Sequence, residues 1–162
     1  KYIDMKRIDY NPENNKHAVI DYNNDYYDIN NQLNYLLLFE SGQIADCSLN
    51  KIIKKEISKK ISSYKSQDKK NSKYDEEQHI SYLQLLSKLK KCNLKCYYCN
   101  EKLFLLYKKR GEPMQWSLER FDNNIGHYET NTCISCLKCN LQRRTSNHEY
   151  FKFSKNLTIS KV

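Results

Sequence analysis

Two pairs of cysteines are the residues of this sequence whose spacing most directly indicates chemistry. Cys96 and Cys99 form the first pair and Cys136 and Cys139 the second, with 36 residues between the pairs. Each pair has the Cys-x2-Cys spacing of a zinc knuckle, and four thiolates from two knuckles can close a tetrahedron around zinc. The sequence therefore predicts a structural zinc site with these four ligands.

Cys133 offers an alternative ligand, because it is also separated from Cys136 by two residues. It stands inside the alternating run NTCISC, which is typical of a strand. A cysteine inside a strand usually packs as a small hydrophobic side chain, so we favour Cys136 with Cys139 as the second pair. Cys47 and Cys92 are expected to be free thiols.

The number of cysteines bears on the cellular compartment and on a competing function. The chain has seven cysteines, an odd and clustered set, whereas a secreted disulfide framework normally pairs an even set. We therefore expect reduced thiols in an intracellular, reducing compartment. A thiol redox protein would also use Cys-x2-Cys, but the paired knuckles and the missing thioredoxin-like βαβ pattern count against that reading.

The segment that contains and follows the second cysteine pair predicts the order strand, strand, helix. Residues 115–121 and 132–135 have strand patterns, and a turn over residues 122–126 lies between them. A helix is expected to begin at Asn140. Three residues are expected to share one face of this helix: Leu141, Thr145 and His148.

The run WSLERFDNNIGHYETNTCISCLKCNLQRR resembles the signature of HNH endonucleases. That signature reads roughly Leu-Asp-Arg-Ile-Asp-Asn, then Gly-His or Gly-Tyr, then Asn and Cys-x2-Cys-Asn. The run is especially similar to versions carried by large DNA viruses and phages, and the resemblance covers residues 86–153. It implies a ββα-metal fold in which one divalent ion, usually magnesium, lies between the first strand and the start of the helix.

The resemblance also implies roles for the residues at matching positions. Glu119 stands where the family has its metal-binding aspartate, and Asn140 stands where it has the second protein ligand of magnesium or manganese. Asn131 matches the asparagine that braces the loop. A hard cation with oxygen ligands polarises the scissile phosphate. Arg120 occupies the position where many relatives have a histidine base, and since arginine stays protonated near neutral pH, we expect it to bind phosphate.

His127 is the candidate general base. An imidazole with an ordinary pKa of about 6.5 suits proton abstraction at physiological pH. The alternative is a histidine that is exposed after Gly126 or caps a turn, and the sequence leaves both open. His148 is expected to be a helix-surface or packing residue, and Asp122 to orient the loop or support Arg120.

Positive charge is concentrated in the C-terminal two-thirds of the chain. The sequence has 28 Lys and Arg against 19 Asp and Glu; the net charge is −4 over residues 1–50, +6 over residues 51–70 and +7 over residues 71–162. Such a field attracts a polyanion, most commonly nucleic acid, although a lysine run can also be a solvated helix face. Nine side chains are expected to contact phosphates: Lys54, Lys55, Lys59, Lys60, Lys108, Lys109, Arg110, Arg143 and Arg144.

Local patterns predict the elements outside the motif. Residues 7–29 alternate polar and apolar side chains around NPENN and predict a hairpin, and NNQLNYLLLFESG predicts a short helix that stops at Gly42. Residues 48–65 predict a basic amphipathic helix, residues 66–78 a linker, and residues 79–91 a further helix. One face of that further helix is expected to carry four apolar residues: Ile80, Leu83, Leu86 and Leu89.

The fold class expected from these observations is α+β. A C-terminal ββα-metal (HNH) domain stapled by a four-cysteine zinc site is preceded by a helical and hairpin N-terminal region. We expect an N-terminal hairpin and short-helix module over residues 1–50 and a basic helix and linker over residues 51–75. The HNH-like nuclease domain is expected over residues 76–155.

The function expected from the sequence is a DNA endonuclease with structural zinc and catalytic magnesium or manganese, with RNA as the alternative substrate. A competing hypothesis keeps the fold as an inactive zinc module that binds nucleic acid, as a subunit of a larger nucleoprotein assembly. Glu119 in place of aspartate and Arg120 in place of histidine are the residues that support it. No run of about eighteen apolar residues is present, so no membrane partner is expected.

Overall fold

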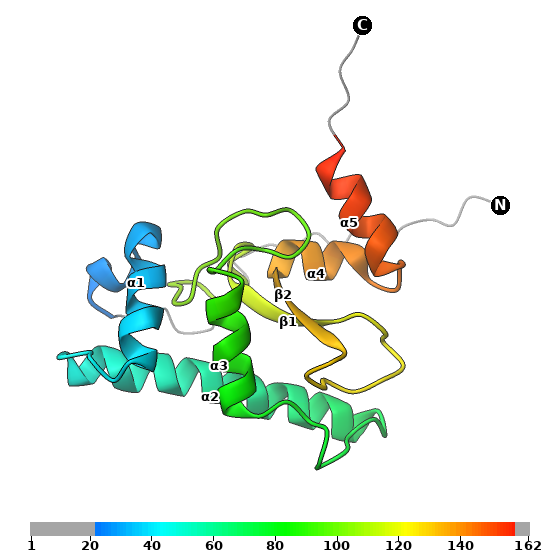
Figure 1. Ribbon diagram of the computed structural model, residues 1–162, viewed down its shortest axis with the longest axis horizontal. Helices are drawn as coiled ribbons and strands as arrows, with labels where there is room; N and C mark the ends of the chain where they lie inside the picture. Colours follow the sequence, from blue (N-terminus) through cyan, green and yellow to red (C-terminus); the bar gives the residue numbers. More distant parts are fainter. Residues whose placement is uncertain (1–21, 158–162) are drawn as a thin grey trace, which may run out of the picture.

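The computed structural model describes residues 22–157 and contains, within them, five α-helices, a short 3-10 helix and a two-stranded antiparallel sheet (Figure 1). The fold is therefore mixed α+β, as predicted. None of the helices in this part of the chain combines the length and the apolar character needed to cross a bilayer. In chain order the elements are η2 (Asn24–Tyr27), α1 (Ile29–Glu40), α2 (Cys47–Lys70), α3 (Tyr82–Lys91), β1 (Trp116–Arg120), β2 (Thr132–Cys136), α4 (Leu137–Arg143) and α5 (His148–Asn156).

The predicted N-terminal hairpin lies mostly outside the described residues, and the described part of it is not a strand. Asn24–Tyr27 forms the 3-10 helix η2, because the Asn23 side chain accepts a hydrogen bond from the amide of Asp25 and starts a helical turn. The predicted short helix is confirmed as α1. Asp28 caps its first turn, and Gly42 follows its end with a φ of +72°, a conformation that favours glycine.

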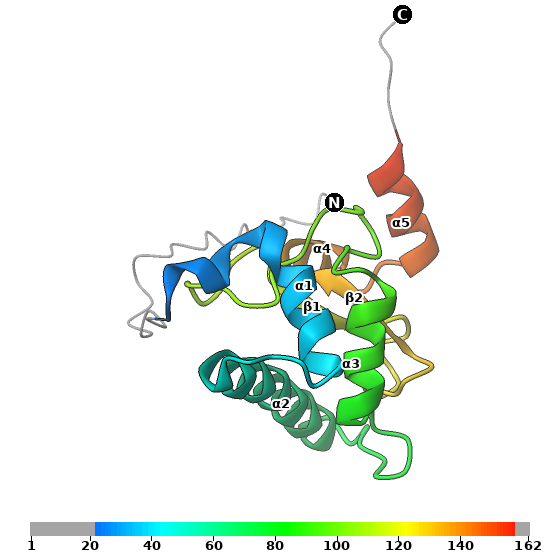
Figure 2. The same cartoon turned by 60° about the vertical axis from the view of Figure 1, so that its left-hand side comes forward.

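Helix α2 is longer than the sequence predicted. Asp46 accepts hydrogen bonds from the amides of Ser48 and Leu49 and begins the helix, which continues to Lys70. The first residues of the predicted linker, 66–70, therefore belong to α2, because they contain no glycine or proline to end it. Both ribbon views show α2 running beneath α1 and α3 (Figures 1 and 2).

Helix α3 begins with a capping box between Ser81 and Gln84. It buries Leu86 and Leu89 as predicted, but Leu83 is 74% exposed. Leu85 takes the buried position that the pattern gave to Leu83. The reason is the helical period: each step of three residues drifts by about 60°, so Leu83 turns away from the face of Leu89, whereas Leu85 lies close to that face. Ile80 is buried but lies in the segment before the helix.

Strands β1 and β2 confirm the predicted strand pair, with Leu118 opposite Ile134 and Glu119 opposite Cys133. Helix α4 follows β2 without a loop and begins at Leu137, three residues before the predicted start, because the Cys136 sulfur accepts the amide of Cys139 at the N-cap. The helix ends at Arg143. Leu141, Thr145 and His148 therefore do not share one helix, since α5 is a separate element.

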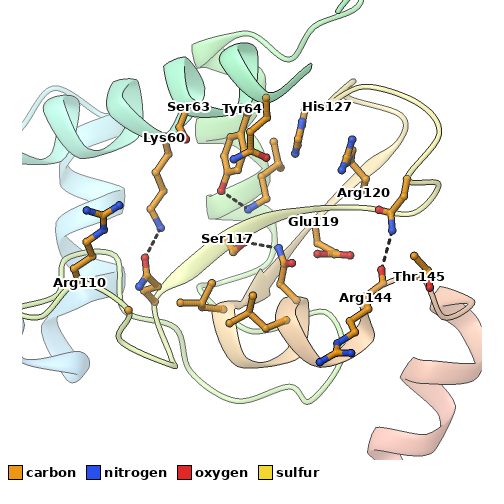
Figure 3. Close-up of a pocket in the computed structure, with 18 residues that line it drawn as sticks. Lys60, Ser63, Tyr64, Arg110, Ser117, Glu119, Arg120, His127, Arg144 and Thr145 are labelled. Atoms are coloured by element: carbon orange, nitrogen blue, oxygen red, sulfur yellow. Dashed lines mark hydrogen bonds between the residues drawn. The ribbon is translucent and has the colours of Figure 1, made fainter. Parts of the chain in front are cut away.

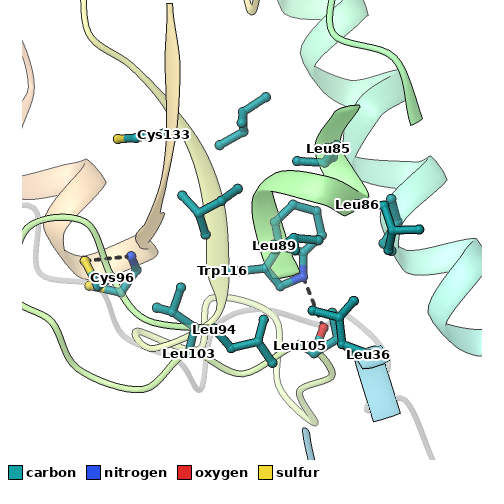
Figure 4. Packing of buried hydrophobic residues seen from close by; sticks show 14 of the residues in the cluster. Leu36, Leu85, Leu86, Leu89, Leu94, Cys96, Leu103, Leu105, Trp116 and Cys133 are labelled. Atoms are coloured by element: carbon teal, nitrogen blue, oxygen red, sulfur yellow. Dashed lines mark hydrogen bonds between the residues drawn. The ribbon is translucent and has the colours of Figure 1, made fainter. Parts of the chain in front are cut away.

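One hydrophobic core joins the helices to the sheet. Leu36 of α1, Ile53 of α2, Leu89 of α3 and Trp116 of β1 are all fully buried members of the same cluster. The Trp116 indole N–H donates to the carbonyl oxygen of Leu105 at 3.1 Å, so this large side chain is buried without an unpaired donor (Figure 4). The basic helix α2 thus packs on the same core as the strands of the motif.

Candidate functional site

The four predicted zinc ligands come together in space. The sulfur atoms of Cys96, Cys99, Cys136 and Cys139 all lie within 4.8 Å of one another. A tetrahedral site with Zn–S bonds of about 2.3 Å requires sulfurs roughly 3.8 Å apart, so small adjustments would close it. Four thiols on two turns are the donor set of a structural zinc site, and this cluster is compatible with one.

Backbone geometry holds each half of this cysteine cluster. In the first half, the amide of Asn100 donates to the carbonyl oxygen of Cys96 at 3.0 Å, and Asn100 has a φ of +59° that turns the chain back. In the second half, Cys136 caps α4 and Cys139 lies in its first turn. A hydrogen bond from the Cys136 thiol lowers the pKa of Cys96 to about 5, which favours the thiolate that binds metal.

The cysteine cluster excludes Cys133, in agreement with the preferred reading of the spacing. Cys133 is buried on β2 opposite Glu119, and burial raises the pKa of its thiol to about 12. It is therefore a packed, protonated side chain, as expected of a strand cysteine. Cys47 and Cys92 are free thiols, as predicted; Cys47 is exposed and Cys92 is half-buried.

A cavity of about 850 Å³ lies between α2, strand β1 and helix α4 (Figure 3). It brings together predicted residues that are as much as 84 positions apart in the sequence. Ser63, Tyr64 and Ser117 also line it. Seven of the predicted site residues line this cavity: Lys60, Arg110, Glu119, Arg120, His127, Asn140 and Arg144.

His127 is buried in the wall of this cavity, with 3% of its surface exposed. Its backbone N–H donates to Asp68 Oδ2 at 2.6 Å, its ring Nδ1 lies 2.8 Å from Asp68 Oδ1, and the ring stacks on Tyr64 at 4.6 Å. Burial lowers the pKa of His127 to about 4, although the Asp68 carboxylate acts in the opposite direction. The imidazole is therefore neutral at neutral pH. The alternative reading of His127 as an exposed residue is wrong.

Asp68 is the site residue that sequence reasoning missed. It is fully buried near the end of α2, whereas its segment was predicted to be a linker. A signal was present, because Ile57, Ile61, Tyr64 and Asp68 follow one another at intervals of four, three and four residues along one helix face. A carboxylate that continues an apolar stripe needs a buried partner, and here His127 is that partner.

Glu119 is held by a buried ion pair. Arg143 Nε donates to Glu119 Oε1 at 2.6 Å and its Nη2 lies 2.5 Å from the same oxygen. The guanidinium also donates to the carbonyl oxygens of Ser146 and Arg120, and Arg143 is only 2% exposed. Burial raises the pKa of Glu119, and Arg143 partly offsets this shift. Arg143 therefore lies inside the protein and cannot reach the phosphates that were predicted as its partners.

Asn140 and Asn131 are fixed by hydrogen bonds of different kinds. The Asn140 side-chain amide donates to Ser117 Oγ at 2.6 Å and lies on the cavity wall, and its side-chain oxygen Oδ1 accepts no hydrogen bond within the described part of the chain. Asn131 donates to the carbonyl oxygens of Asp122 and Gly126 and accepts the amide of Asp122. It braces the loop between the strands, which is the position that the motif resemblance gave it.

The predicted cationic residues fall into exposed and enclosed groups. Arg144 is exposed, whereas the Arg120 guanidinium lies 3.7 Å from Asp68 Oδ1 and donates to the carbonyl oxygen of Ile125. The Lys60 ammonium lies 4.2 Å from the centre of the Trp116 ring and donates to the carbonyl oxygen of that residue. Exposed side chains also include several lysines outside the cavity lining: Lys54, Lys55, Lys59, Lys108 and Lys109.

Lys60 therefore differs from the other lysines of α2. Burial lowers the pKa of its amine to about 7, so the group is only partly charged at neutral pH. Its amine also donates to Gln115 Oε1 at 3.2 Å. Its amine is enclosed between α2 and the start of β1 rather than on the solvated face of the helix, and its contact with phosphate stays a prediction.

Comparisons with known proteins add no relative to this picture. No family model, curated protein or solved structure matches the chain. The likeness to HNH endonucleases therefore rests on the residues of the motif, and the function has to be inferred from the chemistry of the cavity.

Proposed function

We propose that this protein is an HNH-type endonuclease that hydrolyses phosphodiester bonds in DNA with the help of a divalent metal. The observation that carries the proposal is the buried imidazole of His127, held 2.8 Å from Asp68 Oδ1 in the wall of a cavity lined with Arg120 and Arg144. A neutral base beside cationic donors is what hydrolysis of a phosphodiester requires. Asn140 and Glu119 add oxygen ligands to the same cavity.

The residues of the cavity divide the reaction between them. Because the Asp68 carboxylate accepts from Nδ1, the ring proton belongs on Nδ1, and Nε2 keeps the lone pair that accepts the proton of an attacking water. The water oxygen forms a new bond to phosphorus while the bond from phosphorus to the leaving oxygen breaks, and that oxygen takes a proton from solvent. Arg120 and Arg144 donate hydrogen bonds to the phosphate oxygens as charge develops.

Glu119 and Asn140 are the residues that would hold a magnesium or manganese ion. A carboxylate and an amide oxygen are hard ligands that suit either ion, and both residues line the cavity. Arg143 binds Oε1 of Glu119, which leaves Oε2 as the free carboxylate oxygen. When bound, such an ion supplies electrostatic stabilisation of the phosphate charge.

A second function, binding of nucleic acid without cleavage, is supported by one specific contact. The ion pair with Arg143 already neutralises the Glu119 carboxylate, and a neutralised carboxylate attracts a divalent cation less. In this reading the exposed lysines and Arg144 hold phosphates, and the zinc-type cysteine cluster only stabilises the fold. The protein would then serve as a subunit of a larger nucleoprotein assembly.

Cleavage of a supercoiled plasmid separates the two functions. We expect nicking by the wild-type protein with magnesium or manganese and none when calcium replaces them, a comparison that leaves structural zinc in place. His127→Ala should lower the rate by about 10²-fold or more, the usual contribution of a general base. Asn140→Ala should also abolish nicking, and a single-stranded RNA substrate run in parallel tests the alternative substrate.

His148→Ala is the matched control, because His148 packs against Phe121 outside this cavity and is a second histidine of the same region. Its rate should stay within about threefold of wild type, a change of well under 1.4 kcal/mol in the barrier. Binding of DNA without cleavage under every metal condition would contradict the proposed endonuclease function and would favour the second function, binding of nucleic acid without cleavage. An equal loss in both histidine variants would mean that His127 is not the base.

A further inference from the structure

Asp68 has an environment that a residue of purely structural importance does not need. Its carboxylate is fully buried, lies 59 positions from His127 in the sequence, and contacts that residue through both oxygens. Arg120 at 3.7 Å and His79 at 3.5 Å are the other groups at ion-pair distance from it among the residues that the structure describes. Burial of a carboxylate is costly unless its hydrogen bonds and charges are satisfied, and here the groups that satisfy it include the ring of the candidate base.

We propose that Asp68 is the positioning residue of the catalytic histidine: its Oδ1 fixes the proton of His127 on Nδ1 and so keeps Nε2 as the atom that accepts a proton. The inference rests on the proposed function, because a base is needed only if the protein cleaves. It assigns a catalytic task to helix α2, which the sequence motif does not include. The motif thus supplies the base, and a helix from the preceding part of the chain supplies the group that orients it.

Two hydrogen bonds with different consequences support this assignment. Oδ2 accepts the backbone N–H of His127, and that bond alone would be enough to anchor the loop to α2. Oδ1 lies 2.8 Å from the ring nitrogen of His127, a bond that selects one tautomer and one ring orientation, and the Arg120 guanidinium lies farther from the same oxygen at 3.7 Å. The Tyr64 ring stacks on the imidazole from the same helix, so rotation of the ring away from Asp68 is also opposed.

Gly126, in the loop directly before His127, leaves space for the Asp68 carboxylate to approach. A side chain at Gly126 would place its Cβ 3.1 Å from Asp68 Oδ2 and 2.4 Å from the carbonyl oxygen of Lys73. The second distance is shorter than any normal contact, so only glycine fits between α2 and His127 at this position. The backbone at Gly126 therefore lies close against the end of α2, and this brings His127 within reach of the Asp68 carboxylate.

The tautomer of His127 is directly measurable by long-range proton–nitrogen NMR on the zinc-loaded full chain. We expect the wild-type ring to carry its proton on Nδ1. In Asp68→Asn the amide oxygen must still accept the backbone N–H of His127, so the amide NH₂ faces Nδ1 and can only donate. The ring proton should then move to Nε2, and the plasmid-nicking rate should fall by about 10²-fold or more, because Nε2 can no longer accept a proton.

Asp25→Asn is the matched control, since Asp25 is an exposed carboxylate on η2. It should leave both the tautomer and the rate unchanged. A wild-type ring protonated on Nε2 would overturn the inference, and this measurement stands even if Asp68→Asn fails to fold. A folded Asp68→Asn protein with an unchanged tautomer or an unchanged rate would also overturn it. A tautomer shift in a protein that never cleaves DNA would instead refute the proposed function and leave the ring contact established.

Discussion

Two adjacent arginines at the end of α4 occupy opposite environments. Arg143 is buried and donates to Glu119 and to the carbonyl oxygens of Arg120 and Ser146, whereas Arg144 is exposed and lines the cavity. The difference follows from the end of the helix, where Arg144 leaves helical geometry with a φ of +53°. Two residues of the same type, next to each other, are therefore expected to do different things.

Arg143→Ala should destabilise the fold, because it leaves the buried carboxylate of Glu119 without its cation. Removal of one partner from a buried ion pair typically costs about 3–5 kcal/mol in the free energy of unfolding. Arg144→Ala should change stability by no more than about 0.5 kcal/mol, as for other exposed positions, but should weaken DNA binding. Urea unfolding and a binding titration on both variants test the pair.

The double variant Glu119→Gln with Arg143→Met is the control for the buried pair, because it removes both charges and keeps the volume. It should be more stable than Arg143→Ala. Equal stability of Arg143→Ala and Arg144→Ala would contradict the burial of Arg143, and normal DNA binding by Arg144→Ala would remove Arg144 from the proposed phosphate contacts.

At the scale of elements, the two cysteine pairs join parts of the chain that also contact each other directly, since the amide of Tyr97 donates to the carbonyl oxygen of Ile134 at 2.9 Å. The first pair lies in the loop after α3, and the second joins β2 to α4. Because α4 begins on Cys136, a bound zinc would fix the start of the helix that carries Asn140. Loss of one ligand should therefore disturb both the loop and the cavity.

Cys99→Ser should abolish stoichiometric zinc binding and lower the thermal stability of the protein. Zinc binding contributes directly to folding in small metal-stapled regions, so the loss should be several kcal/mol, on the order of the contribution of a structural site. Inductively coupled plasma mass spectrometry and a thermal melt are the measurements. Cys47→Ser, at an exposed cysteine outside the cluster, should keep both zinc and stability. Wild-type protein that contains no zinc and still shows a cooperative thermal unfolding transition would contradict the predicted zinc site.

The sequence predicted the elements that depend on short-range patterns. The alternation in residues 115–121 and 132–135 predicted β1 and β2, and the cysteine spacing predicted the cluster, because both signals are local. The contact between Asp68 and His127 is different, since it joins residues on separate elements. Helical spacing places Asp68 on the buried face of α2, but it does not identify His127 as the partner. The same applies to Arg143, whose burial depends on where α4 ends.

At the scale of the whole molecule, the cavity exists because α2 packs against the sheet. Lys60 and Tyr64 of α2 form one wall, and Ser117 of β1 lies on another (Figure 3). Asn140 of α4 also lines the cavity. The hydroxyl of Tyr64 accepts the backbone N–H of Leu118 at 2.9 Å, which ties the helix to the strand. The HNH-like segment contributes only the wall formed by β1 and α4, because α2 lies outside that segment.

The charge of α2 is arranged around this packing. Its lysines divide between an enclosed one, Lys60, and exposed ones that include Lys54, Lys55 and Lys59. Exposed cations on the helix that forms one wall of the cavity attract a polyanion and release counterions when it binds. DNA affinity should therefore depend steeply on salt, and the exposed lysines should account for part of the slope.

Replacement of Lys54, Lys55 and Lys59 together by glutamine tests this distribution of charge. Each lost phosphate contact should reduce the slope of log K against log salt concentration by about 0.9, so the triple variant should lose roughly 2.7 if all three contact DNA. Lys90→Gln is the control, because Lys90 is paired with Glu40 at 2.7 Å and lies on α3, outside the cavity lining. Fluorescence anisotropy with a labelled duplex over a range of salt concentrations gives the slopes. An unchanged slope in the triple variant would show that DNA does not bind along α2. The DNA phosphates would then have to contact Lys108, Lys109 and Arg144 instead.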